Sequence, residues 1–104
     1  MPDVLIKYND VFVVIEHKIS KELGGGQDKQ MTEIIDFIGY GERGVRYVSY
    51  LDGVLFNELK NPRETNKLYR DKNNIIDNLT NNKYNYFVND YGFKKLINSI
   101  INGD

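Results

Sequence analysis

The 104-residue chain is predicted to be an α/β protein whose mixed sheet begins with an antiparallel hairpin and is flanked by helices. Two β-branched runs separated by a turn dipeptide open the chain and predict the hairpin. Apolar residues then recur at helical spacing, and strand-like segments alternate with helix-like ones. Because strands separated by helices usually run parallel, this order predicts a sheet that is antiparallel at its start and parallel afterwards.

The hairpin is predicted from residues 4–8, "VLIKY", and residues 11–16, "VFVVIE". Both segments are rich in β-branched and aromatic residues, which favour strands. The intervening Asn9-Asp10 pair suits a two-residue turn that needs positive φ. The two strands are therefore expected to pair directly.

A loop and an amphipathic helix are expected next. Residues 19–27 contain three consecutive glycines and show no apolar period, which is typical of a loop. The apolar positions of the helix, at the spacing i, i+3, i+4, i+7, are Met31, Ile34, Ile35 and Ile38. Asp28 is the expected N-cap, and Gly39 or Gly41 is the expected end.

The rest of the chain continues the alternation of strand and helix patterns. The expected elements are a strand at 45–51 that ends at an Asp52-Gly53 turn, short helical segments at 64–70 and 74–79, a strand at 83–90, and a closing helix at 93–101. Tyr84 and Tyr86 alternate within the last strand, so both are expected in the core or on a face of the sheet, and not as platforms on which bases stack.

Composition limits the classes of function. A chain of this length forms one domain, residues 1–104, with a single modest core. The absence of cysteine excludes disulfides and thiolate metal sites, and the chain has neither an apolar run of membrane-spanning length nor a signal sequence, so we expect it in the cytoplasm. With 14 Lys and Arg against 15 Asp and Glu, no global positive charge attracts nucleic acid. The densest basic stretch, residues 60–72, is expected to be mainly a solvated surface.

The hairpin gathers charged side chains at its open end. If Asn9 and Asp10 form the turn, paired residue numbers add up to 19, which places Asp3 opposite Glu16. Facing Cβ atoms lie roughly 4.5–5.5 Å apart. Because side chains alternate along a strand, Lys18 shares the face of Glu16, while His17 points to the other face, where we expect a structural or surface role rather than one as ligand or base.

Two facing carboxylates repel each other unless a proton, a basic group or a metal ion neutralises them. Mg²⁺ prefers hard oxygen ligands and is typically held by one or two carboxylates with waters, which leaves room for a phosphate. A nearby ammonium group can orient the attacking water or hold that phosphate. The pattern thus indicates metal-dependent phosphodiester hydrolysis.

The acid-x-Lys triplet alone is weak evidence, because it occurs twice: at Glu16-His17-Lys18 and at Glu58-Leu59-Lys60. Only the first triplet ends an apolar strand and faces a Pro-Asp pair across a hairpin. The second precedes a proline in a charged stretch, and we expect it on the solvated surface.

Pro2-Asp3, followed after 12 residues by Glu16-His17-Lys18 at the end of "VFVVI", resembles the PD-(D/E)XK signature of type II restriction endonucleases and related nucleases. The glycine-rich loop, the following helix and the strand "VRYVSYL" also resemble the common core of that superfamily. The resemblance implies Asp3 and Glu16 as metal ligands, the His17 main-chain carbonyl as a further Mg²⁺ ligand, and Lys18 as the catalytic lysine. It also implies a helix before the Pro-Asp strand, which the sequence printed here does not include.

The function expected from this resemblance is Mg²⁺-dependent endonuclease cleavage of double-stranded DNA, as in a restriction enzyme, with a homodimer or an additional specificity part as partner. One alternative is a junction-resolving or repair nuclease with the same core. Another is a catalytically silent fragment or interaction module whose acids are merely solvated. The exonuclease branch is disfavoured, because neither Gln27 nor Gln30 has a tyrosine four residues later.

Overall fold

The computed structural model describes residues 3–8, 10–20, 27–53, 59 and 66–102. In chain order its elements are β1 (Val4–Tyr8), β2 (Val11–Ser20), α1 (Gln27–Phe37), β3 (Val45–Gly53), α3 (Asn66–Asn81), β4 (Tyr86–Val88) and α4 (Asp90–Asn102). The four strands form one sheet in the order β1-β2-β3-β4. β1 and β2 are antiparallel, and the β2–β3 and β3–β4 pairs are parallel. The predicted α/β class with a mixed sheet is confirmed.

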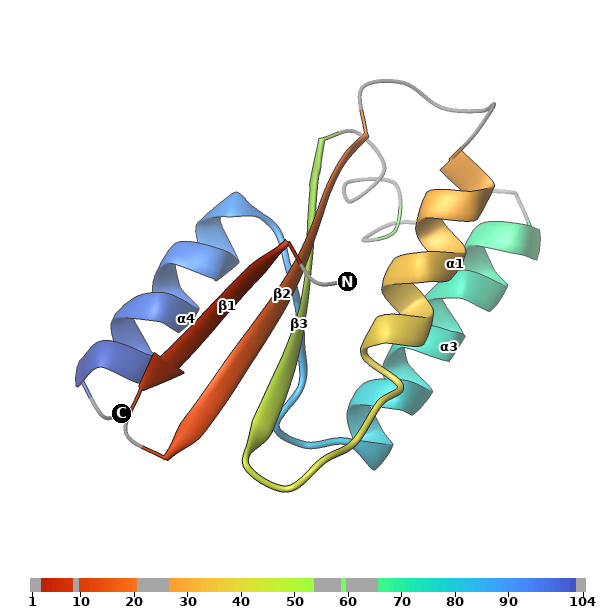
Figure 1. The fold of residues 1–104 in the computed structure, drawn as a ribbon. Helices are drawn as coiled ribbons and strands as arrows, with labels where there is room; N and C mark the ends of the chain where they lie inside the picture. The colour runs from red at the N-terminus through yellow and green to blue at the C-terminus, as the bar shows by residue number, and fades with distance from the viewer. Residues whose placement is uncertain (1–2, 9, 21–26, 54–58, 60–65, 103–104) are drawn as a thin grey trace.

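Helices cover both faces of this sheet, with α1 and α3 on one face and α4 on the other (Figure 1). Strand alternation creates two cores. On the α1 side, buried residues of α1 pack with Leu51 of β3 and Ile75 of α3. On the α4 side, Val13 and Ile15 of β2 pack with Val48 of β3 and Leu96 of α4. The odd-numbered residues of β2 therefore face α4, and its even-numbered residues face α1.

Several element boundaries differ from the predictions. β2 and β3 run on to Ser20 and Gly53, because their parallel ladder continues through the expected Asp52-Gly53 turn. Gly53 has a positive φ of 102° and still pairs with Ser20. α1 begins at Gln27, one residue before the expected N-cap, and ends at Phe37, close to the expected Gly39 stop.

The two short helical segments expected at 64–70 and 74–79 are one continuous helix, α3, in the part described from Asn66 onward. Packing on the α1 side explains this continuity, since Ile75 is buried there, Leu79 packs beside it and the Asn78 side chain donates to the Ile35 carbonyl at 2.9 Å. Tertiary contacts thus override the weak helix propensity of the Asn-rich segment.

The last strand is shorter than predicted and the last helix starts earlier. β4 contains only Tyr86–Val88. The Asn89 side-chain oxygen accepts a hydrogen bond from the Gly92 N–H at 2.9 Å, and its carbonyl accepts from Phe93 at 2.8 Å. Asn89 is therefore the N-cap of α4, and the helix begins at Asp90 rather than at Phe93.

None of the helices among the described residues combines the length and the hydropathy needed to cross a lipid bilayer.

Candidate active site

The pairing of β1 with β2 follows the predicted register. Val4 pairs with Ile15 and Tyr8 with Val11, so paired numbers add up to 19. The Asp3 N–H donates to the Ile15 carbonyl at 2.9 Å, although Ile15 is already the partner of Val4, so the regular register ends at Val4. The expected pairing of Asp3 with Glu16 is therefore not part of the ladder, and the Asp3–Glu16 site stays a prediction. The expected turn residue Asn9 lies outside the described residues.

The Asp3 carboxylate is held against the main chain of β2. Its Oδ2 accepts a hydrogen bond of 2.7 Å from the His17 N–H. Asp3 is otherwise exposed, so its second oxygen faces solvent-accessible space. The acid at the start of the hairpin is thus fixed in position by one main-chain donor.

Lys18 lies between two carboxylates. Its Nζ is 3.4 Å from Glu16 Oε1 and 3.2 Å from Glu33 Oε2 on α1. The side chains of Glu16 and Lys18 are only 14% and 24% exposed, so this pair is shielded from water far more than an ordinary surface ion pair. The hydrogen bond to Glu33, followed by that to Glu16, raises the pKa of Lys18 despite its partial burial. Lys18 is thus a fixed cation at neutral pH.

Glu33 was assigned no chemistry from the sequence, where it is one of several acids on the polar side of a helix. The βαβ crossover brings it to Lys18, because α1 returns across the face of the sheet that carries the even-numbered residues of β2. Ser49 of β3 also contacts α1 on this face, because its Oγ donates a hydrogen bond to the Ile34 carbonyl at 2.6 Å. No local pattern in the sequence could have paired Glu33 with Lys18, because the contact joins β2 to α1.

A recess of about 670 Å³ opens beside Glu16, and we call it the acidic recess. Its lining residues are Glu16, Glu33, Asp36, Phe37, Tyr40, Glu42 and Tyr47. Four of them are acids, and none is Lys or Arg. The Glu42 carboxylate accepts a hydrogen bond from the Tyr47 hydroxyl, and this bond, followed by burial, raises the pKa of Tyr47 to about 12. Asp3 and Lys18 lie beside this recess but do not line it.

His17 occupies the opposite face of the sheet, as strand alternation predicts. Its ring packs against Tyr50, with centroids 4.2 Å apart, within the aromatic side of the α4 core. Its Nε2 is buried and has no hydrogen-bond partner among the described residues. The imidazole therefore cannot reach the acids of the candidate site, and only the His17 main chain lies near them.

The donor set suits a hard divalent cation more than a transition metal. Asp3 and Glu16 would supply carboxylate oxygens, and Mg²⁺ is typically held by one or two carboxylates plus waters. Within the described residues, no group of three or more His, Cys, Asp or Glu side chains is arranged to enclose a metal ion. The residues present therefore fit an open Mg²⁺ site of low protein ligand number, and not a closed metal cage.

Comparison with protein-family models, with curated proteins and with solved structures finds no match to this chain. The candidate site therefore rests on its own geometry and chemistry. The second acid-x-Lys triplet cannot be compared with the candidate site, because Glu58 and Lys60 lie outside the described residues. Leu59, which lies between them, is buried.

Proposed function

We propose that this protein is a Mg²⁺-dependent deoxyribonuclease that hydrolyses a phosphodiester bond with Asp3, Glu16 and Lys18. The observation that carries the proposal is the register of the hairpin. The β1–β2 pairing brings the Asp3 carboxylate to the His17 N–H, next to Glu16 in the chain, and Lys18 forms an ion pair with Glu16 on the same face of β2. Acids that can hold a metal ion and an ammonium group that can stabilise developing negative charge are groups that metal-assisted phosphodiester cleavage uses.

In this proposal Asp3 and Glu16 hold the metal, with the His17 carbonyl as a third oxygen ligand. A bound Mg²⁺ supplies a water of lowered pKa and stabilises charge on the phosphodiester. Lys18 remains protonated beside Glu16, so it stabilises the developing negative charge and does not act as the general base. Glu33 holds the ammonium group in place from the side of α1.

The charge of the acidic recess explains why a divalent cation is needed. Four carboxylates line the recess, and Lys18 alone offsets little of this charge. A DNA phosphate that approaches Glu16 is repelled unless a cation intervenes. Cleavage is therefore expected to depend strictly on Mg²⁺.

Double-stranded DNA is the proposed substrate, and a homodimer is the proposed form for cutting both strands. The same residues would serve a junction-resolving or repair nuclease, which differs in the shape of the DNA it accepts. An interaction module without catalysis would not nick DNA at any metal concentration, which distinguishes it from both kinds of nuclease.

The direct test is the nicking of supercoiled plasmid by the purified chain with and without Mg²⁺. We expect nicking only with Mg²⁺, and a loss of at least about a hundredfold in Lys18→Ala and Glu16→Gln, since the first removes the ammonium group that stabilises developing negative charge and the second removes a proposed metal ligand. Lys29→Ala is the matched control, because Lys29 is an exposed lysine of α1 without an ion pair among the described residues.

A second measurement keeps binding apart from catalysis. Mg²⁺ should raise the Tm of the wild-type protein, since a ligand bound only by the folded state stabilises it, and should not raise the Tm of Glu16→Gln. Plasmid nicking that persists in Lys18→Ala, or that proceeds equally well in EDTA, would contradict the proposal.

A further inference from the structure

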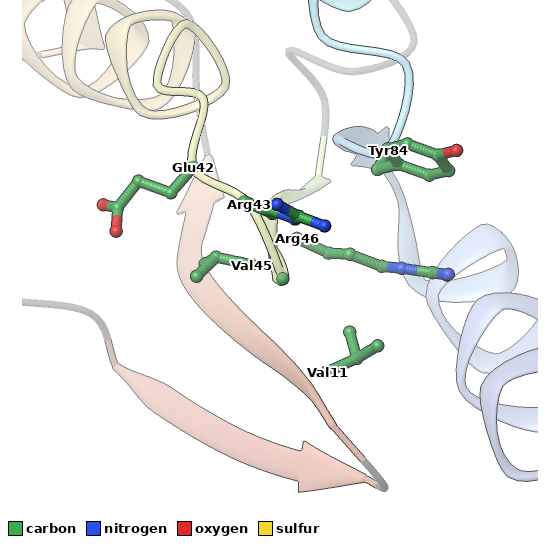
Figure 2. Close-up of a pocket in the computed structure, with 7 residues that line it drawn as sticks. Val11, Glu42, Arg43, Val45, Arg46 and Tyr84 are labelled. Atoms are coloured by element: carbon green, nitrogen blue, oxygen red, sulfur yellow. The ribbon is translucent and has the colours of Figure 1, made fainter.

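A second cavity lies at the end of the sheet where β3 begins. Its volume is about 350 Å³, and we call it the arginine notch. Its lining residues are Val11, Glu42, Arg43, Gly44, Val45, Arg46 and Tyr84. Figure 2 shows that Arg43 and Arg46 extend toward the same side as Tyr84, while Glu42 extends to the other side. The notch therefore presents two guanidinium groups and one aromatic ring together.

A tight turn positions the first arginine. The Val45 N–H donates to the Glu42 carbonyl at 3.2 Å, and Gly44 between them has a φ of +80°, a conformation that favours glycine. The Phe12 N–H donates to the Gly44 carbonyl at 2.8 Å and so attaches the turn to β2. Arg43 is exposed at the tip of this turn.

The guanidinium groups are available to an anion. Among the described residues, neither Arg43 nor Arg46 forms an ion pair with a carboxylate. The only acid that lines the notch is Glu42, and its carboxylate accepts the hydroxyl of Tyr47 on the side of the acidic recess. Two unpaired guanidinium groups at one cavity favour a phosphate, which arginine binds with directed hydrogen bonds.

Tyr84 supplies a flat surface beside these charges. The sequence pattern predicts it in the core or on a face of the sheet, and this prediction is wrong: Tyr84 precedes β4 and is 68% exposed. The Cζ of Arg46 lies 5.6 Å from the centroid of its ring, a cation–π contact that orients both groups. An exposed aromatic ring next to an arginine is the combination on which unpaired bases stack.

We propose that the arginine notch binds one unpaired nucleotide of a DNA strand, with its phosphate on Arg43 and Arg46 and its base on Tyr84. The cavity volume lies at the lower end of the range of small-ligand sites and suits one nucleotide unit. A base in an intact duplex is stacked on both sides, so only an unpaired base can use the Tyr84 ring.

Glu42 connects this inference to the candidate active site, and to that extent the inference rests on the proposed function. Glu42 lines both the notch and the acidic recess. Phe12 pairs with Val45 at the notch, and Glu16 lies four residues further along β2, roughly 13 Å at the rise of a strand. Arg46 pairs with Val13 and so lies on the α4 side of the sheet, whereas Glu16 faces α1. A DNA strand held in the notch reaches Glu16 only by passing Glu42, so the favoured substrate carries its unpaired nucleotide a few nucleotides away from the cleaved bond.

The test is fluorescence anisotropy with a labelled single-stranded deoxythymidine oligonucleotide and an abasic oligonucleotide of the same length, in EDTA so that no cleavage occurs. Tyr84→Leu should weaken binding of the deoxythymidine strand about fivefold or more and leave binding of the abasic strand unchanged, because stacking needs a base. Arg46→Gln should weaken binding of both strands.

Arg70→Gln is the charge-matched control, because Arg70 is exposed on α3, far along the chain from the notch. The inference is wrong if Arg70→Gln weakens oligonucleotide binding as much as Arg46→Gln does, or if Tyr84→Leu leaves binding of the deoxythymidine strand unchanged. It is also wrong if the wild-type protein does not bind that strand. Tyr84 is so exposed that Tyr84→Leu carries the test even if Arg46→Gln fails to fold. If the protein binds the strand but shows no Mg²⁺-dependent nicking, the proposed function is wrong and nucleotide binding at the arginine notch is still supported.

Discussion

The ammonium group of Lys18 lies 3.2 Å from Glu33 on α1, at least as close as it lies to Glu16 on its own strand, at 3.4 Å. This contact joins the hairpin to the helix that crosses over it. In the proposed reaction, it makes Glu33 a positioning residue that acts through Lys18. The two glutamates have different proposed tasks, since Glu16 is a proposed metal ligand and Glu33 is not.

Replacement of Glu33 tests this division of tasks. Glu33→Gln removes the largest cause of the raised pKa of Lys18, so that pKa should fall. Lys18 then loses its proton at lower pH, and the alkaline limb of the pH profile of plasmid nicking should move to lower pH. Asp36→Asn, which removes an exposed acid of the same recess, is the control and should leave the limb in place. Identical limbs in wild type and Glu33→Gln contradict a positioning role.

Asp3 has a structural contact and a proposed chemical role, and two substitutions separate them. Asp3→Asn keeps an oxygen that can accept the His17 N–H, so the free energy of unfolding should change by less than about 0.5 kcal/mol, as at most surface positions. Asp3→Ala removes that hydrogen bond and should cost about 1 kcal/mol. Urea denaturation measures both values. Mg²⁺-dependent nicking should be lost in both variants, and full activity in Asp3→Asn would exclude Asp3 as a metal ligand.

Asn85 is expected to be the most sensitive polar residue of the fold. It is 7% exposed; its Nδ2 donates to the carbonyls of Ile38 and Tyr40, and its Oδ1 accepts from the Tyr47 N–H. Asn85→Ala leaves these main-chain groups without their partner and should lower the free energy of unfolding by about 2 kcal/mol. Asn98→Ala, at an exposed position of α4, should change it little. Equal urea midpoints for the two variants would contradict this expectation.

Two tyrosines should titrate late. Hydrogen bonds to Glu42 and Asp90, followed by burial, raise the pKa values of Tyr47 and Tyr50 from 10.0 to about 12. Both pKa values in the folded state lie above the ordinary value of tyrosine. The contribution of these two hydrogen bonds to the stability of the fold is therefore fully present below pH 10 and is lost as the pH rises through about 12. Absorbance at the phenolate band should show a late phase that shrinks in Tyr47→Phe and Tyr50→Phe. A single phase centred near pH 10 would contradict both contacts.

Local rules were enough to predict the hairpin part of the candidate site. The Asn9-Asp10 pair specified the register, and strand alternation then assigned Glu16 and Lys18 to one face and His17 to the other. These predictions depend on neighbouring residues alone, and the register and the faces are confirmed. The metal and the reaction remain predictions.

Residues that depend on long-range packing were missed. Glu33 reaches Lys18 only through the crossover of α1, whose position over the sheet no local pattern specifies. Tyr84 was assigned to a strand by its alternation with Tyr86, but the intervening Asn85 turns inward to bind the main chain of two other segments. Arg43 and Arg46 meet Tyr84 across a gap of about 40 residues in the chain, so no spacing rule could pair them.

The position of Glu42 between the two cavities has a consequence for how a polyanion approaches. A formal net charge of −1 suggests an electrically featureless protein. Four of its acids instead line one recess, and two arginines that have no ion pair among the described residues line the next, so the surface has a local dipole with Glu42 at its midpoint. Such a dipole gives no general attraction, but it exerts a torque on an approaching chain of phosphates and selects the direction in which that chain lies.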